Sequence, residues 1–442
     1  MASATRRLAF GATLAFVAAL SGCAGAPDRA DAGKDASDTA GTDTSDTADT
    51  ETFDTASDGG PDSSGPDGGP DASADAGACT GEEPLCAGET VVSCVDGSRE
   101  ETPCGKGTFC NYGACEKSQV NLPKDAAPHN FKSEWWYYTG HVADGEQRYG
   151  FEVTIFKYNL SVFKGYMCHV AVLDVNAGEH YHTDEIAVAP SKWQSAPIVL
   201  AVGSCRFELD GEGHDHIKGT IAKGKEKDKK GAPWIVDLSF DPQKRPALHG
   251  DGGFIPMSDS GGTSWYYSYT RMDAVGTIAT PDGVRDVAGI GWMDHQWGAF
   301  DVMTAFKGWD WWSMQLDDGY EIMLFQFRNW QDVLVTQAGT VMDPKGNQVT
   351  FEGLDSFSIS SRRTWPSPHT DGVYPLDWDI AIVAGDWALD VLVGVDDQEM
   401  YNPAQNYWEG ATAISGWRGG TAVVGVGYTE LTGYASDLLD PP

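Results

Sequence analysis

Apolar and polar residues alternate over most of the chain after about residue 120, and this pattern predicts β-strands. The alternating runs are broken by turn-forming sequences such as Asp-Gly, Asn-Ala-Gly and Gly-Glu-Gly. No long amphipathic helical pattern is evident in this region. Aromatic strands at short spacing, joined by Gly-rich turns, favour an all-β fold of meandering antiparallel sheets closed into barrels. The clearest predicted strands are 149–158, 169–175, 201–209, 234–240, 264–270, 321–329, 373–383 and 387–393.

The stretch 289–298, Gly-Ile-Gly-Trp-Met-Asp-His-Gln-Trp-Gly, concentrates an acid, an imidazole and two indoles in one predicted strand. Side chains of a strand point alternately to its two faces. Trp292 and Asp294 should therefore share one face, and His295 and Trp297 the other. A histidine beside a tryptophan can polarise or protonate a bound apolar molecule. The alternative is that both tryptophans fill a core while the polar groups bond to neighbouring backbone.

Three landmarks of the β-region occur twice, once in each half and in the same order. Each is a short motif of aromatic residues or of Gly-x-Gly followed by an aromatic residue and an acid. Their repetition in order indicates two diverged copies of one β-unit. The matched segments are 134–137 with 310–313, 265–268 with 407–410, and 289–294 with 425–430.

The first 22 residues have the features of a bacterial export signal. Arg6-Arg7 give a positive start, 8–20 form an apolar core, and Leu20-Ser-Gly-Cys23 resembles the lipobox of bacterial lipoproteins, which implies that Cys23 is lipidated. An ordinary secretory peptide is the alternative. The apolar run is too short for a membrane-spanning helix. Ala24 replaces the aspartate that retains enteric lipoproteins in the inner membrane. We therefore expect a lipid-anchored protein of the cell envelope, at the outer membrane.

Residues 23–78 consist, after Cys23, mainly of Ala, Asp, Gly, Ser, Thr and Pro. The segment has many acidic residues, and Arg29 and Lys34 are its only basic ones. Phe53 is its single aromatic residue. Such a segment cannot bury enough apolar surface to offset its ordering entropy, so we predict an acidic, disordered tether. The tether carries a good part of the net charge of −35. The acidic balance elsewhere argues against nucleic acid as a partner.

Residues 79–118 form a further segment, which is defined by its cysteines. An even set at this density in an exported chain indicates a disulfide framework, which substitutes for the core that the segment lacks. A zinc knuckle is the alternative, but neither a Cys-x-x-Cys pair nor a nearby histidine supports it. We expect a small stalk or contact module, and the sequence does not determine which cysteines pair. It also leaves open whether Cys168 and Cys205 in the β-region are bonded. The six cysteines are Cys79, Cys86, Cys94, Cys104, Cys110 and Cys115.

The β-region carries five short motifs that are specific only in combination. They are Glu134-Trp-Trp-Tyr-Tyr-Thr-Gly, Ser264-Trp-Tyr-Tyr-Ser, Asp294-His-Gln-Trp-Gly, Tyr407-Trp-Glu-Gly and Gly427-Tyr-Thr-Glu-Leu-Thr-Gly-Tyr. Together, over 129–436, they resemble the AttH-like, carotenoid 1,2-hydratase family. The resemblance implies two tandem lipocalin-like antiparallel β-barrels, which we expect at 120–300 and 301–436. Family members include hydratases that add water to an isoprenoid alkene, pericyclases that act on polyenes, and exported proteins described as hydrolases.

The resemblance also carries expectations about chemistry. The hydratases use the His and Trp of a His-x-Trp unit, here His295 and Trp297, and a later Tyr-x-Asp pair whose Asp donates a proton. The position of that pair, near 325–327, reads Phe-Gln-Phe, and the acids at 317–318 lie at a predicted turn. We expect a protein that holds a hydrophobic small molecule (lipid, isoprenoid or polyene) and acts on it by acid-catalysed hydration or isomerisation. A non-catalytic carrier and a secreted hydrolase are the alternatives, so catalysis itself is left open.

The candidate catalytic residues are His295, Asp294 and Glu134. Burial of Glu134 beside the neighbouring tryptophans would raise its pKa and make it a proton donor, whereas a barrel-closing hydrogen bond to backbone is the alternative. We expect the pocket around His295 and Trp297, at the inner end of the first barrel where it faces the second, because clefts between domains often hold ligands. Its expected aromatic lining is Trp297, Trp292, Trp135, Trp136, Tyr138, Trp311 and Trp312.

Other chemistry has weaker signals. His180-x-His182 and His214-x-His216 could each place two imidazoles on one strand face as metal ligands, but exposed turn histidines are favoured because no third ligand is near. Asp259-Ser-Gly-Gly resembles a serine-protease fragment, yet no Gly-x-Ser-x-Gly elbow accompanies it. No phosphate-binding or dinucleotide motif is visible. We therefore expect no metal, no cofactor and a monomer, with a hydrophobic small molecule and the membrane as its partners.

Overall fold

The computed structural model describes residues 84–160, 164–222, 232–258, 262–300, 306–402 and 405–436. The export signal, Cys23, the acidic tether and Cys79 lie outside these residues, as do 259–261. The described part of the chain is built from antiparallel strands, as the sequence predicts. It contains no helix with the length and apolar character needed to cross a membrane.

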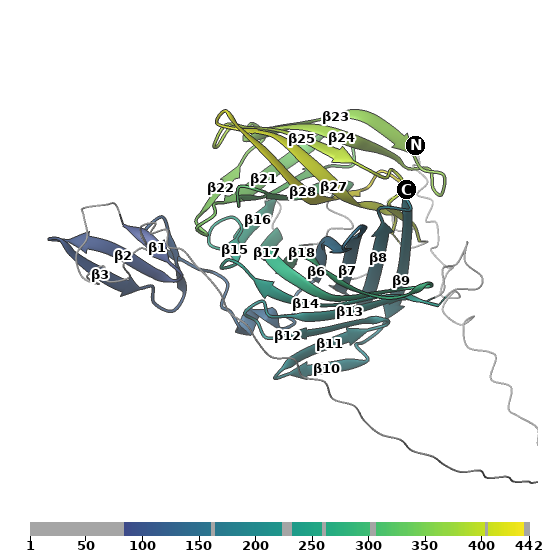
Figure 1. The fold of residues 1–442 in the computed structure, drawn as a ribbon, viewed down its shortest axis with the longest axis horizontal. Coiled ribbons are helices and arrows are strands. Elements are labelled where there is room, and N and C mark those ends of the chain that lie inside the picture. Colours follow the sequence, from purple (N-terminus) through teal and green to yellow (C-terminus); the bar gives the residue numbers. More distant parts are fainter. Residues whose placement is uncertain are drawn as a thin grey trace, which may run out of the picture. The chain divides into compact units, whose positions relative to one another are not determined.

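The first large sheet has thirteen strands and curls into a barrel (Figure 1). Its main path runs β10-β11-β12-β13-β14-β17-β18-β6-β7-β8-β9, and β15 and β16 pair with β17. The strands are β6 (Ser133–Asp144), β7 (Gln147–Asn159), β8 (Lys164–Asp174), β9 (Glu179–Ala187), β10 (Lys192–Ser195), β11 (Ile198–Val202), β12 (Cys205–Leu209), β13 (His216–Ile221), β14 (Trp234–Pro242), β15 (Ala247–Leu248), β16 (Phe254–Ser258), β17 (Gly262–Thr280) and β18 (Gly283–Gly298).

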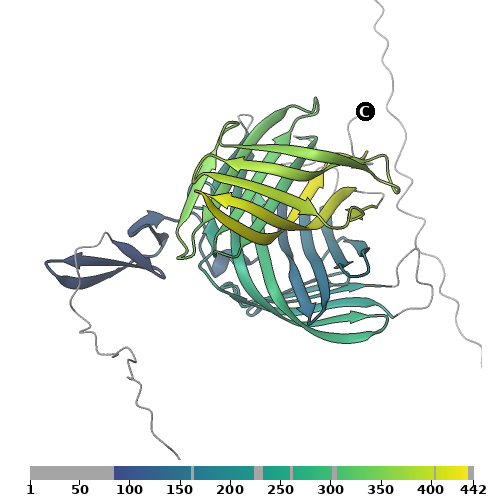
Figure 2. The same cartoon turned by 45° about the horizontal axis from the view of Figure 1, so that its top comes forward.

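The second large sheet has ten strands and is curved in the same way (Figure 2). Its path runs β22-β21-β20-β19-β28-β27-β25-β24-β23, and β26 pairs with β27. The strands are β19 (Gly308–Leu316), β20 (Glu321–Arg328), β21 (Leu334–Met342), β22 (Gln348–Glu352), β23 (Phe357–Pro366), β24 (Val373–Ile382), β25 (Trp387–Val393), β26 (Glu399–Met400), β27 (Tyr407–Arg418) and β28 (Thr421–Thr432).

The strand orders of the two sheets repeat, in agreement with the internal duplication in the sequence. The run β14-β17-β18-β6-β7-β8-β9 of the first sheet corresponds to β25-β27-β28-β19-β20-β21-β22 of the second. The matched landmarks fall on corresponding strands: the Trp-rich motifs begin β6 and β19, and the Gly-x-Gly motifs lie on β18 and β28. The fold is therefore a tandem pair of barrels.

Strand β18 is buried on both of its faces over 291–298. It pairs with β17 on one side and with β6 on the other. Met293 and Trp297 pack in the core inside the first barrel. Trp292 packs in a second core that also contains Trp311 of the second barrel. The two-face pattern predicted from the sequence is confirmed. One face of β18 lies inside the first barrel, and the other faces the second barrel.

One predicted strand, 201–209, is instead a hairpin. Strand β11 ends at Val202 and β12 begins at Cys205. Gly203 forms the turn with φ of +54°, a conformation that glycine adopts without steric cost. The apolar alternation continues on both sides of the turn, which explains why it reads as one strand.

The cysteine-rich segment contains a three-stranded sheet and a hairpin. The strands are β1 (Leu85–Ala87), β2 (Thr90–Val95), β3 (Ser98–Pro103), β4 (Thr108–Asn111) and β5 (Ala114–Lys117), and a 3-10 turn η1 (Lys124–Ala126) leads to the first barrel. Disulfides join Cys86 to Cys110 and Cys104 to Cys115. Cys94 is also disulfide-bonded. The predicted disulfide framework is thus present in the described part of the segment.

Cys168 and Cys205, whose state the sequence leaves open, form a disulfide between β8 and β12. Both side chains are buried in the core of the first barrel. The bond closes a loop with a sequence separation of 37 residues.

Replacing both cysteines, Cys168→Ala with Cys205→Ala, should lower the free energy of unfolding by about 2–4 kcal/mol, because the unfolded chain regains the entropy that the cross-link removes. Urea unfolding under non-reducing conditions measures this. Wild-type protein in which this bond is selectively reduced should match the double variant. An unchanged urea midpoint would show that the bond contributes nothing to stability.

Candidate functional site

The first face of β18 carries His295 into the interior of the first barrel, where its side chain is fully buried. Its Nε2 lies 3.2 Å from Glu134 Oε1, and its Nδ1 lies 3.3 Å from the Tyr267 hydroxyl. The ring stacks on Trp136 at 4.7 Å between centroids. Burial lowers the pKa of His295 to about 4, so the imidazole is neutral near pH 7. Nε2–H then donates to Glu134, and Nδ1 accepts from Tyr267.

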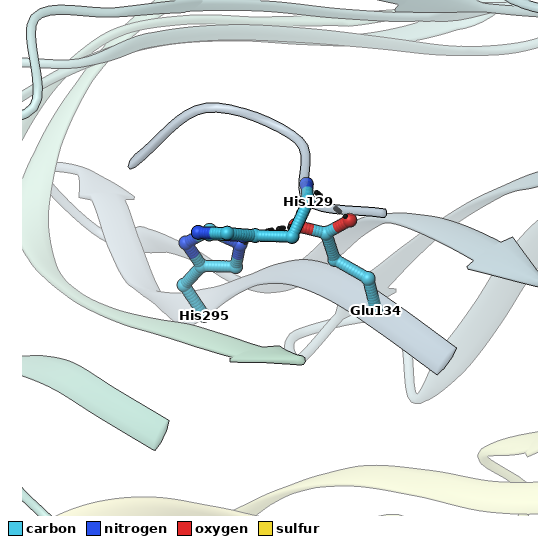
Figure 3. A group of neighbouring side chains, drawn as sticks. All are labelled: His129, Glu134 and His295. Carbon is cyan, nitrogen blue, oxygen red and sulfur yellow. Dashed lines mark hydrogen bonds and ion pairs between the residues drawn. The ribbon is translucent and has the colours of Figure 1, made fainter. Parts of the chain in front are cut away.

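Glu134 begins β6 and is fully buried, yet its carboxylate is surrounded by donors (Figure 3). Both oxygens accept from the backbone N–H of His129 at 2.9 Å, and Lys157 Nζ lies 2.8 Å from Oε2. Burial alone would raise its pKa, but the hydrogen bonds from His129 and His295 and the charge of Lys157 lower it to about 2. The raised pKa that a proton-donor role for Glu134 would require is not found, because donors outweigh desolvation. Its bond to backbone matches the structural alternative.

His129, Glu134 and His295 place one ligand atom each within 4.8 Å of one another, which is close enough to hold a metal ion. The remaining contacts disfavour a cation at this point. The Lys157 ammonium already neutralises Glu134, and the backbone N–H of His129 occupies both carboxylate oxygens. His129 also stacks on Trp297 at 4.1 Å between ring centroids. His129, Glu134 and His295 therefore form a hydrogen-bonded group that closes one end of the first barrel.

The second face of β18 carries Asp294 toward the second barrel. Its Oδ2 accepts from the Tyr266 hydroxyl at 2.7 Å, and its Oδ1 accepts from Trp292 Nε1 at 2.6 Å and from the Ser268 hydroxyl. Burial raises the pKa of Asp294 to about 7, against the lowering effect of these hydrogen bonds. A large share of this carboxyl therefore carries a proton at neutral pH.

Asp294 lines a cavity of about 40 Å³ that lies between the barrels. Its volume is close to the roughly 30 Å³ that one water occupies in the liquid. Nine of the twelve lining residues are aromatic. The lining residues are Trp135, Tyr137, Phe156, Tyr158, Tyr266, Asp294 and Gln296 from the first barrel, and Trp309, Trp311, Phe325, Phe327 and Glu430 from the second.

Three further buried carboxyls lie close to this space. Glu430 accepts from Trp309 Nε1 at 2.9 Å, and burial raises its pKa to about 7. Glu409 accepts from the Tyr137 hydroxyl at 2.5 Å, and burial together with the nearby charges of Glu430 and Glu152 raises its pKa. Burial also raises the pKa of Glu152 to about 8, and among the described residues neither of its oxygens has a hydrogen-bond partner. Burial therefore favours the protonated form of all three acids, and Glu430 titrates near neutral pH.

The residues expected at one site divide between three spaces. Trp135 and Trp311 line the inter-barrel cavity, and Trp292 packs edge-on against Trp311 at 6.1 Å between centroids. Trp136, Tyr138 and Trp297 lie inside the first barrel with His295, and Trp312 lies inside the second. The space that faces the second barrel is thus lined by Asp294 and not by His295 and Trp297, because alternation turns adjacent residues of β18 to opposite sides.

Several residues of the cavity were not found from the sequence. Glu430 could have been found, because the Gly-x-Gly-aromatic-x-acid repeat matches it to Asp294. Tyr266 lies in the Ser264-Trp-Tyr-Tyr-Ser motif, but nothing in that motif marks it as a cavity residue, and Glu152, close to the cavity, gives no signal because it sits within an apolar strand. The Phe-Gln-Phe segment on β20 supplies Phe325 and Phe327 to the cavity wall. Asp317 and Asp318 lie in the turn between β19 and β20, as predicted.

The histidine pairs differ from their expected placement. His180 and His182 do not sit in an exposed turn: both are half-buried on β9, with ring centroids 5.7 Å apart. The β8–β9 turn ends before them, so alternation keeps both on one strand face. His214 is exposed and bonds to Asp210 at 2.9 Å, whereas His216 lies on β13 and bonds to Asp237 at 2.7 Å. His214 also forms an exposed acidic group with Asp210 and Glu212.

Comparisons with known proteins agree with this architecture. The chain is 26% identical over 204 residues to kievitone hydratase of Fusarium solani subsp. phaseoli. The aligned segment covers 44% of this chain and 56% of that relative. It thus spans about half the length of the curated relative. Among solved structures, an AttH protein from Nitrosomonas europaea is 27% identical with a TM-score of 0.61, covering 72% of this chain and 98% of that one.

The structure of kievitone hydratase from Nectria haematococca has the same fold, with 15% sequence identity and a TM-score of 0.58. The match covers 72% of this chain and 93% of that one. The double-barrel fold is therefore related to that of a hydratase. The sequence model of the AttH-like family matches residues 114–434, which includes both barrels and the Asp294 motif. This chain belongs to the AttH-like family.

Proposed function

We propose that the inter-barrel cavity binds a hydrophobic small molecule with a carbon–carbon double bond and that the protein adds water to it by acid catalysis. The observation that carries the proposal is a buried carboxyl, Asp294, whose pKa is raised to about 7 in a cavity with aromatic walls. General acids work best when their pKa lies near the working pH. The relation to kievitone hydratase supports hydration over other acid chemistry.

Asp294 is the proton donor in this reaction. The hydroxyls of Ser268 and Tyr266 can accept as well as donate, so the same contacts accommodate both the protonated and the ionised carboxyl. Transfer of the proton to one alkene carbon forms a C–H bond and leaves a carbocation at the other carbon. The faces of Trp311 and Trp135 stabilise that cation, because aromatic rings attract positive charge.

Glu430 completes the reaction as the base. A water oxygen forms a bond to the cationic carbon, and the ionised Glu430 carboxylate accepts the proton that this water loses. Glu430 lines the same cavity as Asp294, and its pKa is also about 7, so one acid can be protonated while the other is ionised. Proton transfer from Glu430 back to Asp294 through solvent restores the starting state, and the net change is the addition of one water.

Ser268 does not fit the role of a hydrolase's nucleophile. Ser268 bonds to both His249 Nε2, at 2.7 Å, and Asp294, so the hydroxyl lies between the imidazole and the carboxylate. A catalytic triad needs the imidazole in the middle. The other nitrogen of His249 bonds to the Thr340 hydroxyl at 2.8 Å, not to an acid. Ser268 is also fully buried.

Binding without turnover is the second candidate function. The aromatic walls alone are compatible with it, although a ligand larger than a few atoms must displace aromatic side chains to enter the cavity. A carrier needs only those walls, whereas a hydratase also needs the two acids. The variants below separate the two functions.

Asp294→Asn should lower the rate of hydration by at least about 100-fold, because the amide cannot donate the catalytic proton. The variant should still fold and bind the ligand. The assay incubates molecules co-purified from the native host, and a panel of isoprenoids and polyenes, in ¹⁸O-labelled water, and mass spectrometry detects the labelled alcohol. Asp286→Asn, on an exposed part of the same strand, is the matched control. The wild-type rate should peak near pH 7, since Asp294 must be protonated and Glu430 ionised. Binding without labelled product in the wild type would establish the carrier.

The protonated acids also predict a pH dependence of stability that needs no substrate. The folded-state pKa of Glu152 lies above its unfolded value of 4.5, so its stabilising contribution is complete below that value and is lost as pH rises through about 8. Glu152→Gln should remove this loss, with a gain relative to wild type on the order of 3 kcal/mol between pH 5 and 8. Urea unfolding at several pH values measures it. Parallel pH profiles for variant and wild type would contradict a protonated Glu152.

We also propose that Cys23 anchors the protein to the outer membrane of the cell envelope through an N-terminal lipid. Cys23→Ala should move the protein from the membrane fraction to the soluble fraction, or block its maturation, because a thiol is required for lipidation. Fractionation followed by immunoblotting measures this, with the wild-type protein as the reference. A variant that fractionates and migrates like wild type would rule out the lipoprotein assignment.

A further inference from the structure

A groove of about 990 Å³ lies beside the inter-barrel cavity. Three parts of the chain form its walls: the cystine-stabilised hairpin β4–β5, the segment 249–256 around β16, and strands β20 to β22 of the second barrel. Aromatic side chains are spread over all three walls, and His249 lies on the surface of the groove. The aromatic lining residues are Phe109, Tyr112, Phe254, Phe325 and Phe351.

The groove and the cavity share a thin partition. Phe325 lines both spaces. Beside it, His249 of the groove bonds to the Ser268 hydroxyl, and the same hydroxyl donates to Asp294 of the cavity. One aromatic side chain and one hydroxyl thus connect the groove to the carboxyl that we propose as proton donor. Movement of Phe325 would join the two spaces.

The hairpin wall is held firmly against the second barrel. The Asn111 side chain donates to the Gln348 carbonyl at 3.1 Å and accepts from the Gln348 N–H at 2.8 Å. The Arg245 guanidinium lies 4.6 Å from the centre of the Phe109 ring. The AttH-like match begins at residue 114, so strand β4 precedes the family domain. The first strand of this wall therefore lies outside the family match, whereas β5 (Ala114–Lys117) lies within it.

We propose that the groove is the second compartment of the ligand site and that it holds the elongated apolar body of the molecule whose double bond reacts in the cavity. This inference rests on the proposed function. A cavity of about 40 Å³ cannot hold such a body, whereas 990 Å³ lies within the range of small-molecule sites. Glu116, Lys117, Asp251 and Glu352 also line the groove, so the ligand is an apolar chain with a polar end group directed toward these charges.

A charge placed in the groove wall tests the proposal. Val349 lines the groove from the edge strand β22, and Val335 lies on β21 without lining it; both are 40% exposed. Val349→Asp should weaken binding of the fluorescent polyene ester methyl cis-parinarate, whose end group is uncharged, by about tenfold or more, because an apolar chain would have to desolvate the carboxylate. Val335→Asp, the matched control, should bind like wild type. Circular dichroism melting checks that both variants fold.

A second variant tests the hairpin wall. Tyr112 is 56% exposed and has φ of +44°, a conformation that asparagine tolerates. Tyr112→Asn should therefore preserve the hairpin and weaken probe binding several-fold through loss of the aromatic contact.

Trp311→Ala, at a residue that lines the cavity and not the groove, separates the groove proposal from the proposed function once circular dichroism melting has shown that it folds. If Trp311→Ala weakens probe binding while Val349→Asp and Tyr112→Asn do not, the cavity binds the ligand and the groove inference is overturned. If the two groove variants weaken binding and Trp311→Ala does not, the groove inference holds and the proposed use of the cavity is overturned. If the wild-type protein does not bind the probe, both proposals are overturned for apolar chains.

Discussion

The structure depends on one constraint, which is that strand β18 is buried on both faces. A strand at the surface of a barrel normally exposes every second side chain. Here the second barrel covers that outer face, so Trp292 and Asp294 are as deeply buried as Met293 and His295. The same strand therefore builds the core of the first barrel and the floor of the inter-barrel cavity, and a change in its register would disrupt both.

Burying acids between two barrels is costly, and the structure meets that cost in two ways. Asp294, Glu430, Glu409 and Glu152 have raised pKa values, so a substantial share of these carboxyls is protonated at neutral pH, which reduces the buried charge. Elsewhere on the interface a buried acid is paired with two basic residues: Glu321 of the second barrel lies 2.5 Å from both Lys244 and Arg271 of the first. The ion pairs hold the barrels together while the protonated acids provide reactive groups.

The two barrels repeat a structural device but not the chemistry. In each, a buried acid on the first strand pairs with a basic residue on the second: Glu134 with Lys157 at 2.8 Å, and Asp310 with Arg328 at 3.3 Å. These pairs lie inside the barrels and close them. The acids with pKa values near neutrality lie between the barrels, where the duplicated units meet. Duplication thus created a new space whose walls come from both copies.

The sequence by itself determined the all-β class, the internal repeat, the cystine framework and the sorting of 289–298 onto two faces, because strand alternation and turn chemistry are local properties. Only the tertiary structure decided which space each face adjoins, so the cavity that faces the second barrel is lined by Asp294 and not by His295. It also decided the ionisation of Glu134, since His129 and Lys157 reach it from other segments. Burial and long-range donors set a pKa, and neither is visible along the chain.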